Sequence, residues 1–174
     1  MSQAQAQPLA VEPEQYLTFL LAQESFAIGI LAIREIIEYQ GVTEVPMMPA
    51  CVRGVINLRG AVVPVVDLQA RFGRPSSVVT KRTCVVIVEA DSGDGERQVM
   101  GLVVDAVNEV IDIAPADIEP APAFGARIRN DFIRGVGKVR GRFVLLLDVD
   151  RALSIDEIAG LAEPLTEAVE AVAA

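Results

Sequence analysis

The chain alternates short apolar runs with single turn residues, and this pattern is typical of β-strands. Ten segments are rich in valine, isoleucine, leucine or phenylalanine and are punctuated by turn residues such as glycine, proline, serine and asparagine. The predicted strands are residues 16–22, 25–31, 34–39, 53–58, 61–68, 82–90, 97–105, 106–113, 132–139 and 142–149.

The strand pattern occurs twice along the chain, as an internal sequence repeat. The segment CVRGVINLRGAVVPVVDLQARF, from Cys51, matches FIRGVGKVRGRFVLLLDVDRAL, from Phe132, at an offset of 81 residues and without a gap. A second match joins FAIGILAIREIIEY, from Phe26, to MGLVVDAVNEVIDI, from Met100, at an offset of 74. Chance similarity between two valine-rich strands explains one such match but hardly both, so the two matches indicate a duplicated unit.

The size of the repeated unit indicates its architecture. Five strands in about 60 residues suit a small closed β-barrel, in which closure removes the exposed sheet edges. We therefore predict a mainly β protein with two five-stranded barrels, the first unit at about 16–80 and the second at about 81–153; the pattern leaves open whether the barrels exchange elements. Short helices are expected after Asp67 and Asp148, and a C-terminal helix is expected from the capping-box pattern that begins at Ser154.

Glycines recur at two places in each unit. Gly60 and Gly141 lie between two predicted strands, where a tight hairpin requires positive φ. Gly54 and Gly135 fall inside predicted strands, which indicates a bulge or a close approach of another backbone segment. The duplication explains all four glycines without any function.

Two charged positions also recur. Arg59 and Arg140 precede the turn glycines, and Glu35 and Glu109 lie at the start of equivalent strands. One interpretation is that all four are solvated charges on a soluble surface. The other is that they belong to a binding surface, because binding residues concentrate on loops that a rigid scaffold holds.

Negative charge is concentrated at the two ends of the chain. The net charge is −9, from 24 acidic and 15 basic residues. Residues 1–15 and 156–174 hold seven acids and no base, so the body between them is nearly neutral, with 17 acids and 15 bases. We interpret 1–15 as a disordered tail and 161–174 as an acidic, alanine-rich tail. A nearly neutral body argues against a nucleic-acid partner, which requires a clustered basic face.

Absent residue types exclude most catalytic sites. Without histidine there is no imidazole base, no histidine-activated nucleophile and no histidine metal ligand. Cys51 and Cys84 stand in unrelated contexts and predict reduced thiols in a cytoplasmic protein. The chain has no phosphate-binding loop, no basic secretory leader, and no apolar run of the roughly 18 residues that cross a bilayer. We predict a protein that is not an enzyme, has no metal or cofactor, and does not insert into the membrane.

One stretch resembles a known family. PACVRGVINLRGAVVPVVDL (49–68), with FAIGILAIREII (26–37) before it and VMGLVVDAVNEV (99–110) after it, is very similar to the CheW chemotaxis coupling proteins. The resemblance covers about 16–160, and the GVxNLRGxxxPVxDL segment is specific. It implies two SH3-like barrels in a cytoplasmic adaptor of a two-component signalling system. It further implies that this scaffold lies at membrane-associated receptor arrays and links the cytoplasmic tips of methyl-accepting chemotaxis receptors to the regulatory domain of the histidine kinase CheA.

The resemblance also implies site residues, position by position. Arg59 and Glu35 match the family's charged pair at the receptor and signalling surface. The implied receptor-binding positions are Glu35, Arg59, Gly54, Gly60, Val85 and Val110. The implied kinase-binding positions are Leu17, Ile30 and Ile33, for which ordinary barrel core is the alternative interpretation.

Two alternative functions remain open at this point. The first is another SH3-like barrel protein that binds a small ligand or nucleic acid. Such a protein should show basic stripes or aromatic platforms, and this chain has no tryptophan and only two tyrosines. The second alternative is a coupling protein of a non-flagellar chemosensory pathway.

Overall fold

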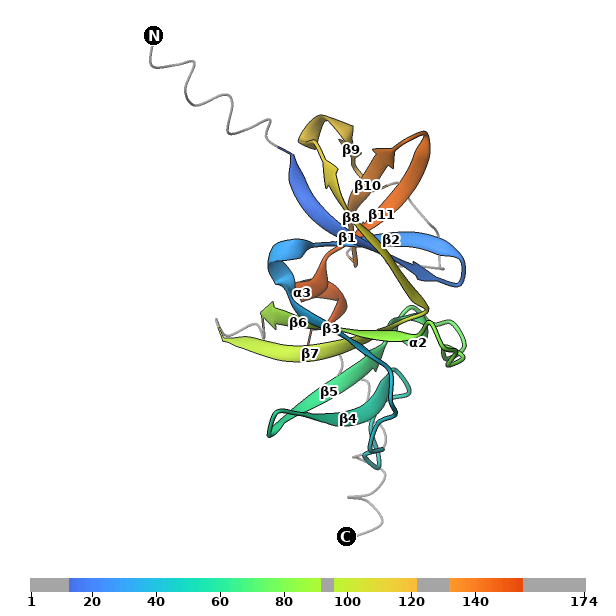
Figure 1. Ribbon diagram of the computed structural model, residues 1–174, viewed down its shortest axis with the longest axis vertical. Helices are drawn as coiled ribbons and strands as arrows, with labels where there is room; N and C mark the ends of the chain where they lie inside the picture. Colours follow the sequence, from blue (N-terminus) through green and yellow to red (C-terminus); the bar gives the residue numbers. More distant parts are fainter. Residues whose placement is uncertain (1–12, 92–95, 122–131, 155–174) are drawn as a thin grey trace, which may run out of the picture.

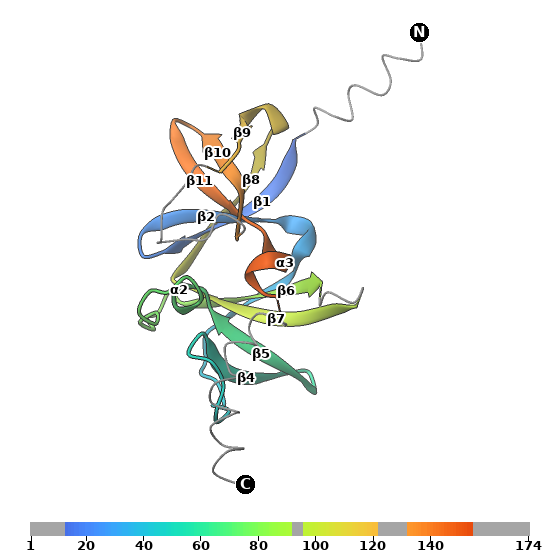
Figure 2. The same ribbon diagram turned by 180° about the vertical axis from the view of Figure 1, so that it is seen from behind.

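Two curved β-sheets stack along the long axis of the molecule (Figure 1). The computed structural model describes residues 13–91, 96–121 and 132–154. The six-stranded sheet has the order β8-β1-β2-β11-β10-β9, and the five-stranded sheet has the order β3-β6-β7-β5-β4. The view from behind shows the short helix α3 between the two sheets (Figure 2). The protein is therefore mainly β, as predicted, and its two sheets are compatible with two SH3-like barrels.

All ten predicted strands are present. The strands are β1 (Glu14–Leu21), β2 (Glu24–Gly29), β3 (Ile33–Glu38), β4 (Val52–Leu58), β5 (Ala61–Asp67), β6 (Cys84–Asp91), β7 (Arg97–Val104), β8 (Ala106–Ile113), β9 (Ile118–Glu119), β10 (Ile133–Val139) and β11 (Arg142–Leu147). The helical pieces are η1 (Ile30–Ala32), α2 (Leu68–Arg71), η2 (Pro115–Asp117) and α3 (Val149–Ala152). Only β9, two residues long, has no counterpart among the predicted strands.

Three further sequence expectations concern the ends and the helices. The helices predicted after Asp67 and Asp148 are α2 and α3, and each aspartate caps its helix by accepting backbone N–H bonds. β1 begins at Glu14, so the last two residues of the predicted N-terminal tail belong to a strand. The predicted helix after Ser154 and the predicted C-terminal tail lie outside the described residues.

Each sheet is built from both repeat units. Strands β1 and β2 of the first unit lie beside β8, β10 and β11 of the second, and β6 and β7 of the second unit lie beside β3, β4 and β5 of the first. The sequence boundary near residue 80 is therefore not a boundary between sheets. The first unit contributes β1 and β2 to the six-stranded sheet and β3, β4 and β5 to the five-stranded sheet. The second unit contributes β6 and β7 to the five-stranded sheet and its remaining strands to the six-stranded sheet.

The equivalence of the units extends to individual residue pairs. In one sheet β5 and β7 run parallel with Val65 opposite Gly101, and in the other sheet β11 and β2 run parallel with Leu146 opposite Ala27. These two pairs are related by the same offsets, 81 and 74, that the sequence repeat shows. The bulge before Gly54 in β4 recurs before Gly135 in β10. The predicted duplication is thus confirmed in strand order and register.

A row of aromatic rings joins the units through the core. Phe19, Phe26, Phe72 and Phe132 follow one another with ring centroids 6.2, 6.0 and 5.8 Å apart. All four are buried, and they come from β1, from β2, from the end of α2 and from the start of β10. Because the rings belong to both units and both sheets contribute to the surrounding core, the protein is packed as one body.

The glycine expectations are confirmed. Gly60 and Gly141 have φ of 89° and 77°, as a tight hairpin requires. Gly54 has φ of 150° and lies in the bulge of β4, and a Cβ atom there would lie 2.2 Å from the carbonyl oxygen of Thr43. A Cβ atom at Gly135 would lie 2.9 Å from the Glu119 carbonyl oxygen. The two strand glycines therefore allow a close backbone approach.

We expect Gly54→Ala to destabilise the protein by about 3 kcal/mol, because the new methyl group overlaps a backbone atom that cannot move without breaking the Thr43–Val55 bridge. Gly60→Ala is the matched control, since its φ is also positive but the space around it is open. This control should cost only about 1–2 kcal/mol. Urea unfolding followed by circular dichroism measures both, and equal losses would contradict the close-approach explanation.

Candidate functional site

The candidate site begins at the turn between β4 and β5. Leu58 pairs with Ala61, so Arg59 and Gly60 alone form the turn, with φ of 52° and 89°. Two positive φ values define a type I′ turn, whose first position favours asparagine or glycine. An arginine there costs about 1–2 kcal/mol of backbone strain. Arg59 therefore occupies a turn position whose backbone geometry does not favour arginine.

The side chain of Arg59 forms a two-pronged ion pair with Glu35. Its Nη1 and Nη2 atoms donate to Glu35 Oε1 and Oε2 at 2.6 and 2.8 Å. Glu35 lies on β3 and Arg59 on the β4–β5 hairpin, and these elements stand at opposite ends of the strand order. The pair therefore connects the two edges of a curved sheet. Fork geometry of this kind is strong and directional.

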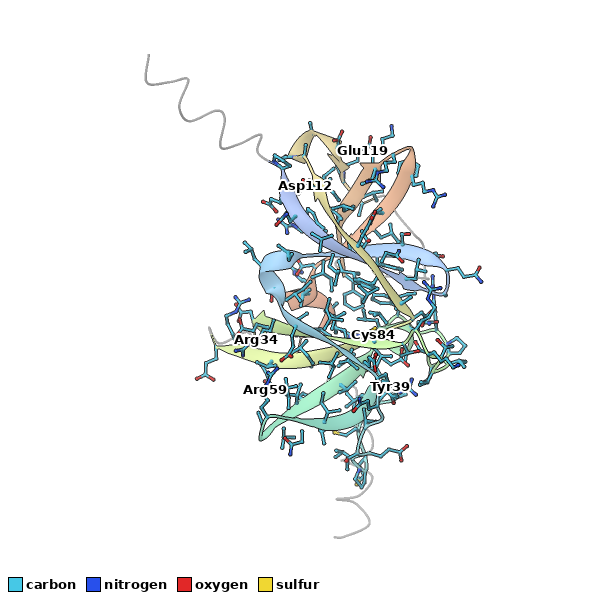
Figure 3. The ribbon with its side chains drawn as sticks, viewed as in Figure 1. Arg34, Tyr39, Arg59, Cys84, Asp112 and Glu119 are labelled. Carbon is cyan, nitrogen blue, oxygen red and sulfur yellow. The ribbon has the colours of Figure 1, made fainter. Side chains whose placement is uncertain are left out.

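The ion pair faces solvent. The Arg59 side chain is 75% exposed and the Glu35 side chain 26% exposed. Figure 3 shows Arg34 and Arg59 on the same side of the five-stranded sheet, away from Tyr39 and Cys84. A shallow groove of about 440 Å³ lies at the pair, and its other lining residues are Arg34, Leu58, Ala61, Val63, Ile87 and Val99. The site offers charged groups above a mostly apolar floor.

The pair lowers the pKa of Glu35 below its ordinary value of 4.5, chiefly through the hydrogen bonds from Arg59. We expect Arg59→Ala to raise this pKa back toward 4.5, as measured by carboxyl-carbon NMR during a pH titration. Because the folded-state pKa is the lower one, the pair stabilises the fold above pH 4.5. That contribution is lost as the pH falls through the folded-state value. An unchanged Glu35 pKa in the variant would show that the pair is absent in solution.

The repeat produces a second pair of the same kind. Arg140, at φ of 50°, occupies the equivalent turn, and its Nη1 lies 3.5 Å from Glu109 Oε1. Here the contact is single and longer, and the side chains are 79% and 55% exposed. The four recurrent charges of the sequence thus form two repeat-related pairs, of which only the first is a close fork.

An apolar corner lies where the chain passes from one sheet to the other. The turn η1 connects β2 in the six-stranded sheet to β3 in the five-stranded sheet. Leu31 in this turn is 97% exposed, and the predicted kinase-binding residues Ile30 and Ile33 beside it are half-buried. Sequence reasoning missed Leu31 because residues 25–31 looked like one strand, whereas the strand ends at Gly29.

The turn η1 lines a groove of about 730 Å³, which α3 and the edges of β6 and β7 also line. The charged rim of this groove includes Glu89, Arg97 and Asp150. The corner therefore combines one exposed leucine and two half-buried isoleucines with a charged border.

Four other predicted site residues lie elsewhere. Leu17 and Val85 are 3% and 1% exposed, and Gly54 is buried under Thr43. The side chains of Leu17 and Val85 therefore lie in the core, which for Leu17 is the alternative interpretation that the sequence left open. Val110 is half-exposed on β8, in the other sheet from Arg59. Only Glu35, Arg59 and Gly60 of the predicted receptor-binding set come together.

The described ranges contain neither a cluster of metal-ligating side chains nor a helix able to cross a membrane. No three or more side chains of aspartate, glutamate, cysteine or histidine gather there as a metal site. None of the helices in that part of the chain has the length and apolar content needed to cross a membrane.

Comparison with known proteins identifies the family. The model of the CheW-like domain matches residues 15–157. The chemotaxis protein CheW of Rhizobium meliloti (strain 1021) is 35% identical over 143 residues, which cover 82% of this chain and 89% of that protein. Its counterpart from Klebsiella aerogenes is 34% identical over 146 residues, covering 84% and 85%. The crystal structure of the scaffolding protein TtCheW from Thermoanaerobacter tengcongensis superposes with a TM-score of 0.73 at 33% identity, covering 82% and 89%. The chain therefore belongs to the CheW-like family of chemotaxis scaffold proteins.

Proposed function

We propose that this chemotaxis coupling adaptor holds the cytoplasmic tip of a methyl-accepting receptor on one surface and the regulatory domain of the kinase CheA on another, at membrane-associated receptor arrays. Proteins of this family are scaffolds and not enzymes. The observation that carries the proposal is the exposed Arg59–Glu35 ion pair, whose arginine occupies a strained turn and whose contacts are shorter than the single contact of its repeat-related copy.

The receptor surface in this proposal contains Glu35, Arg59 and Gly60. The guanidinium group of Arg59 has five donor N–H groups, and the fork to Glu35 leaves further donors for a partner's carboxylate or carbonyl groups. The apolar side chains that line the groove provide surface from which partner binding removes water. A charged group above a small apolar area supports a modest, reversible affinity, which suits an adaptor in an assembled array.

The kinase surface in this proposal contains Ile30, Leu31 and Ile33. Leu31, which is 97% exposed, lies beside the half-buried Ile30 and Ile33 and lines a groove with Ile30, and this contiguous apolar area supports the assignment. The receptor surface lies on the β4–β5 hairpin and at Glu35 of β3, and the kinase surface lies on the turn η1 and at Ile33, the first residue of β3. The two surfaces therefore adjoin on β3, and each has its own exposed side chain, Arg59 or Leu31.

We expect Leu31→Glu to weaken binding of the CheA regulatory domain roughly ten- to a hundredfold, since an apolar interface side chain is worth about 1–3 kcal/mol. Calorimetric titration of the isolated regulatory domain into each variant measures the loss. The circular dichroism spectrum and unfolding midpoint should stay at wild-type values, because Leu31 makes little contact with its own chain.

Leu17→Glu provides the control for this experiment. Leu17 is in the core, so a buried unpaired carboxylate there should unfold the protein and not merely weaken binding. If Leu31→Glu binds the regulatory domain like the wild type, the corner is not the kinase surface. Unfolding of the Leu31 variant would likewise contradict the exposed position on which the proposal rests.

A further inference from the structure

The groove at the Arg59–Glu35 pair has a repeat-related counterpart on the six-stranded sheet. Every residue that lines the first groove has an equivalent, by strand register, that lines a groove of about 730 Å³ around Arg140 and Glu109. The equivalents are Asn108, Glu109, Val139, Arg140, Arg142, Val144, Thr18 and Ser25. The duplication thus produced the same groove twice, and differences between the two reveal how the second has diverged.

The second groove has gained polar and basic side chains. Thr18 and Ser25 stand where the first groove has Ile87 and Val99, so hydroxyl groups replace two apolar side chains. Arg142 stands in the place of Ala61 and adds a positive charge. These changes add hydroxyl groups and a guanidinium group to the groove, in which Val107, Ile111, Val139 and Val144 remain apolar.

A third arginine completes the set. Arg82, from the segment before β6, lines the second groove and has no equivalent in the first. The groove therefore holds three arginines, Arg82, Arg140 and Arg142, against one acid, Glu109. In the first groove Arg59 is held by a close fork to Glu35, and Arg34 lies 3.5 Å from Glu89. Among the described residues, the second groove has only the single 3.5 Å contact between Arg140 and Glu109 as an ion pair.

The backbone around these arginines is fixed. The Thr18 hydroxyl donates to the Glu109 carbonyl oxygen at 2.9 Å and accepts from the Glu109 backbone N–H at 3.2 Å. Arg140 is the first residue of the two-residue turn of the β10–β11 hairpin, and Arg142 directly follows that turn. Donors held on a rigid frame in this way bind carboxylates without a large ordering cost.

We propose that this second groove binds an acidic segment through its carboxylates, and that the occupant is the chain's own stretch 156–174. The basis is charge complementarity: that stretch carries Asp156, Glu157, Glu163, Glu167 and Glu170 and no basic residue. The body of the protein is nearly neutral, but this groove has three arginines and one glutamate and therefore a net charge of about +2. The inference does not depend on the proposed receptor and kinase partners.

The length of the segment is sufficient. The described residues end at Ser154, after which 20 residues remain. An extended chain of that length spans roughly 60 Å, which exceeds the roughly 40 Å diameter expected of a compact chain of this size. A segment of this length can therefore reach much of the body's surface, and charge complementarity favours the second groove as its binding site.

NMR spectroscopy of the full-length chain tests the proposal. We compare the wild type with a variant in which all five acids of 156–174 are changed to the corresponding amides. Neutralisation should shift the backbone amide signals of Ser25, Asn108 and Arg142 in the second groove. The equivalent residues of the first groove, Val99, Arg34 and Ala61, provide the control within the same spectrum and should not shift. Raising the salt to about 0.5 M should move the same second-groove signals in the same direction, because salt screens exposed charges.

The reciprocal experiment changes the groove. Arg142→Ala, which restores the residue of the first groove, combined with Arg82→Ala, should shift the amide signals of 156–170 toward their positions in high salt. Arg34→Ala in the first groove should leave those signals in place. The proposal is overturned if neutralising the acids leaves the second groove unchanged or shifts both grooves alike. It is also overturned if the arginine variants leave the acidic stretch unchanged.

Discussion

Arg59→Ala is expected to abolish receptor-dependent activation of the kinase while leaving the free energy of unfolding close to its wild-type value at neutral pH. The stability change is small because the Arg59 side chain is 75% exposed and touches little besides Glu35. The functional change is large because alanine cannot replace a forked, charge-assisted donor. A reconstituted assay of kinase autophosphorylation with receptor, together with thermal unfolding, measures both quantities.

The duplication provides the matched control for this experiment. Arg140 has the same turn, the same positive φ and a similar exposure, so Arg140→Ala should give the same small stability change. It should nevertheless leave kinase activation close to the wild-type level, because its contact with Glu109 is single and lies on the other sheet. Equal activity of the two variants would make Arg59 an ordinary turn residue. Arg59→Lys should behave like Arg59→Ala, since lysine keeps the charge but loses the fork.

Strand positions were predictable because they depend on local pattern. The runs around Val55 and Val136 are bounded by glycine turns in both copies, and both became the expected hairpins. The positive φ of Gly60 followed from the turn between two strands. These features are decided by a few neighbouring residues, so the sequence contains all the information that they need.

Features that depend on distant parts of the chain were not predictable in the same way. The exchange of strands between sheets depends on the parallel pairing of β2 with β11 and of β7 with β5, and no local residue determines that pairing. The contact of Arg59 with Glu35 requires the sheet to curve until its edges meet. Leu31 looked like the end of a strand and is an exposed corner, while Leu17, assigned by family resemblance, lies in the core. Burial was thus the property that the sequence pattern specified least well.

One hydrogen-bond network of the first unit is larger than what the described residues show at the equivalent Asp148, and it should carry an unusual share of the stability. Asp67 is completely buried at the end of β5. Its carboxylate accepts from Arg53 Nη1 at 3.0 Å, from the Ser77 backbone N–H at 2.8 Å and from the Ser77 hydroxyl at 3.0 Å. It also caps α2 by accepting from the Gln69 N–H at 3.0 Å. One side chain therefore connects two strands, a helix and the segment that leads toward β6.

Asp67→Ala is therefore expected to cost about 3–5 kcal/mol, because it leaves buried donors without an acceptor and Arg53 without its counter-charge. Asp148→Ala is the matched control: the equivalent aspartate is half-buried, and its side chain caps α3 by accepting from the Arg151 N–H at 3.2 Å. Loss of a helix cap alone should cost about 1 kcal/mol. Urea unfolding with an unchanged slope measures both variants. Losses of similar size would mean that the Asp67 network contributes no more than a cap, and that the two units remain equivalent in energy as well as in register.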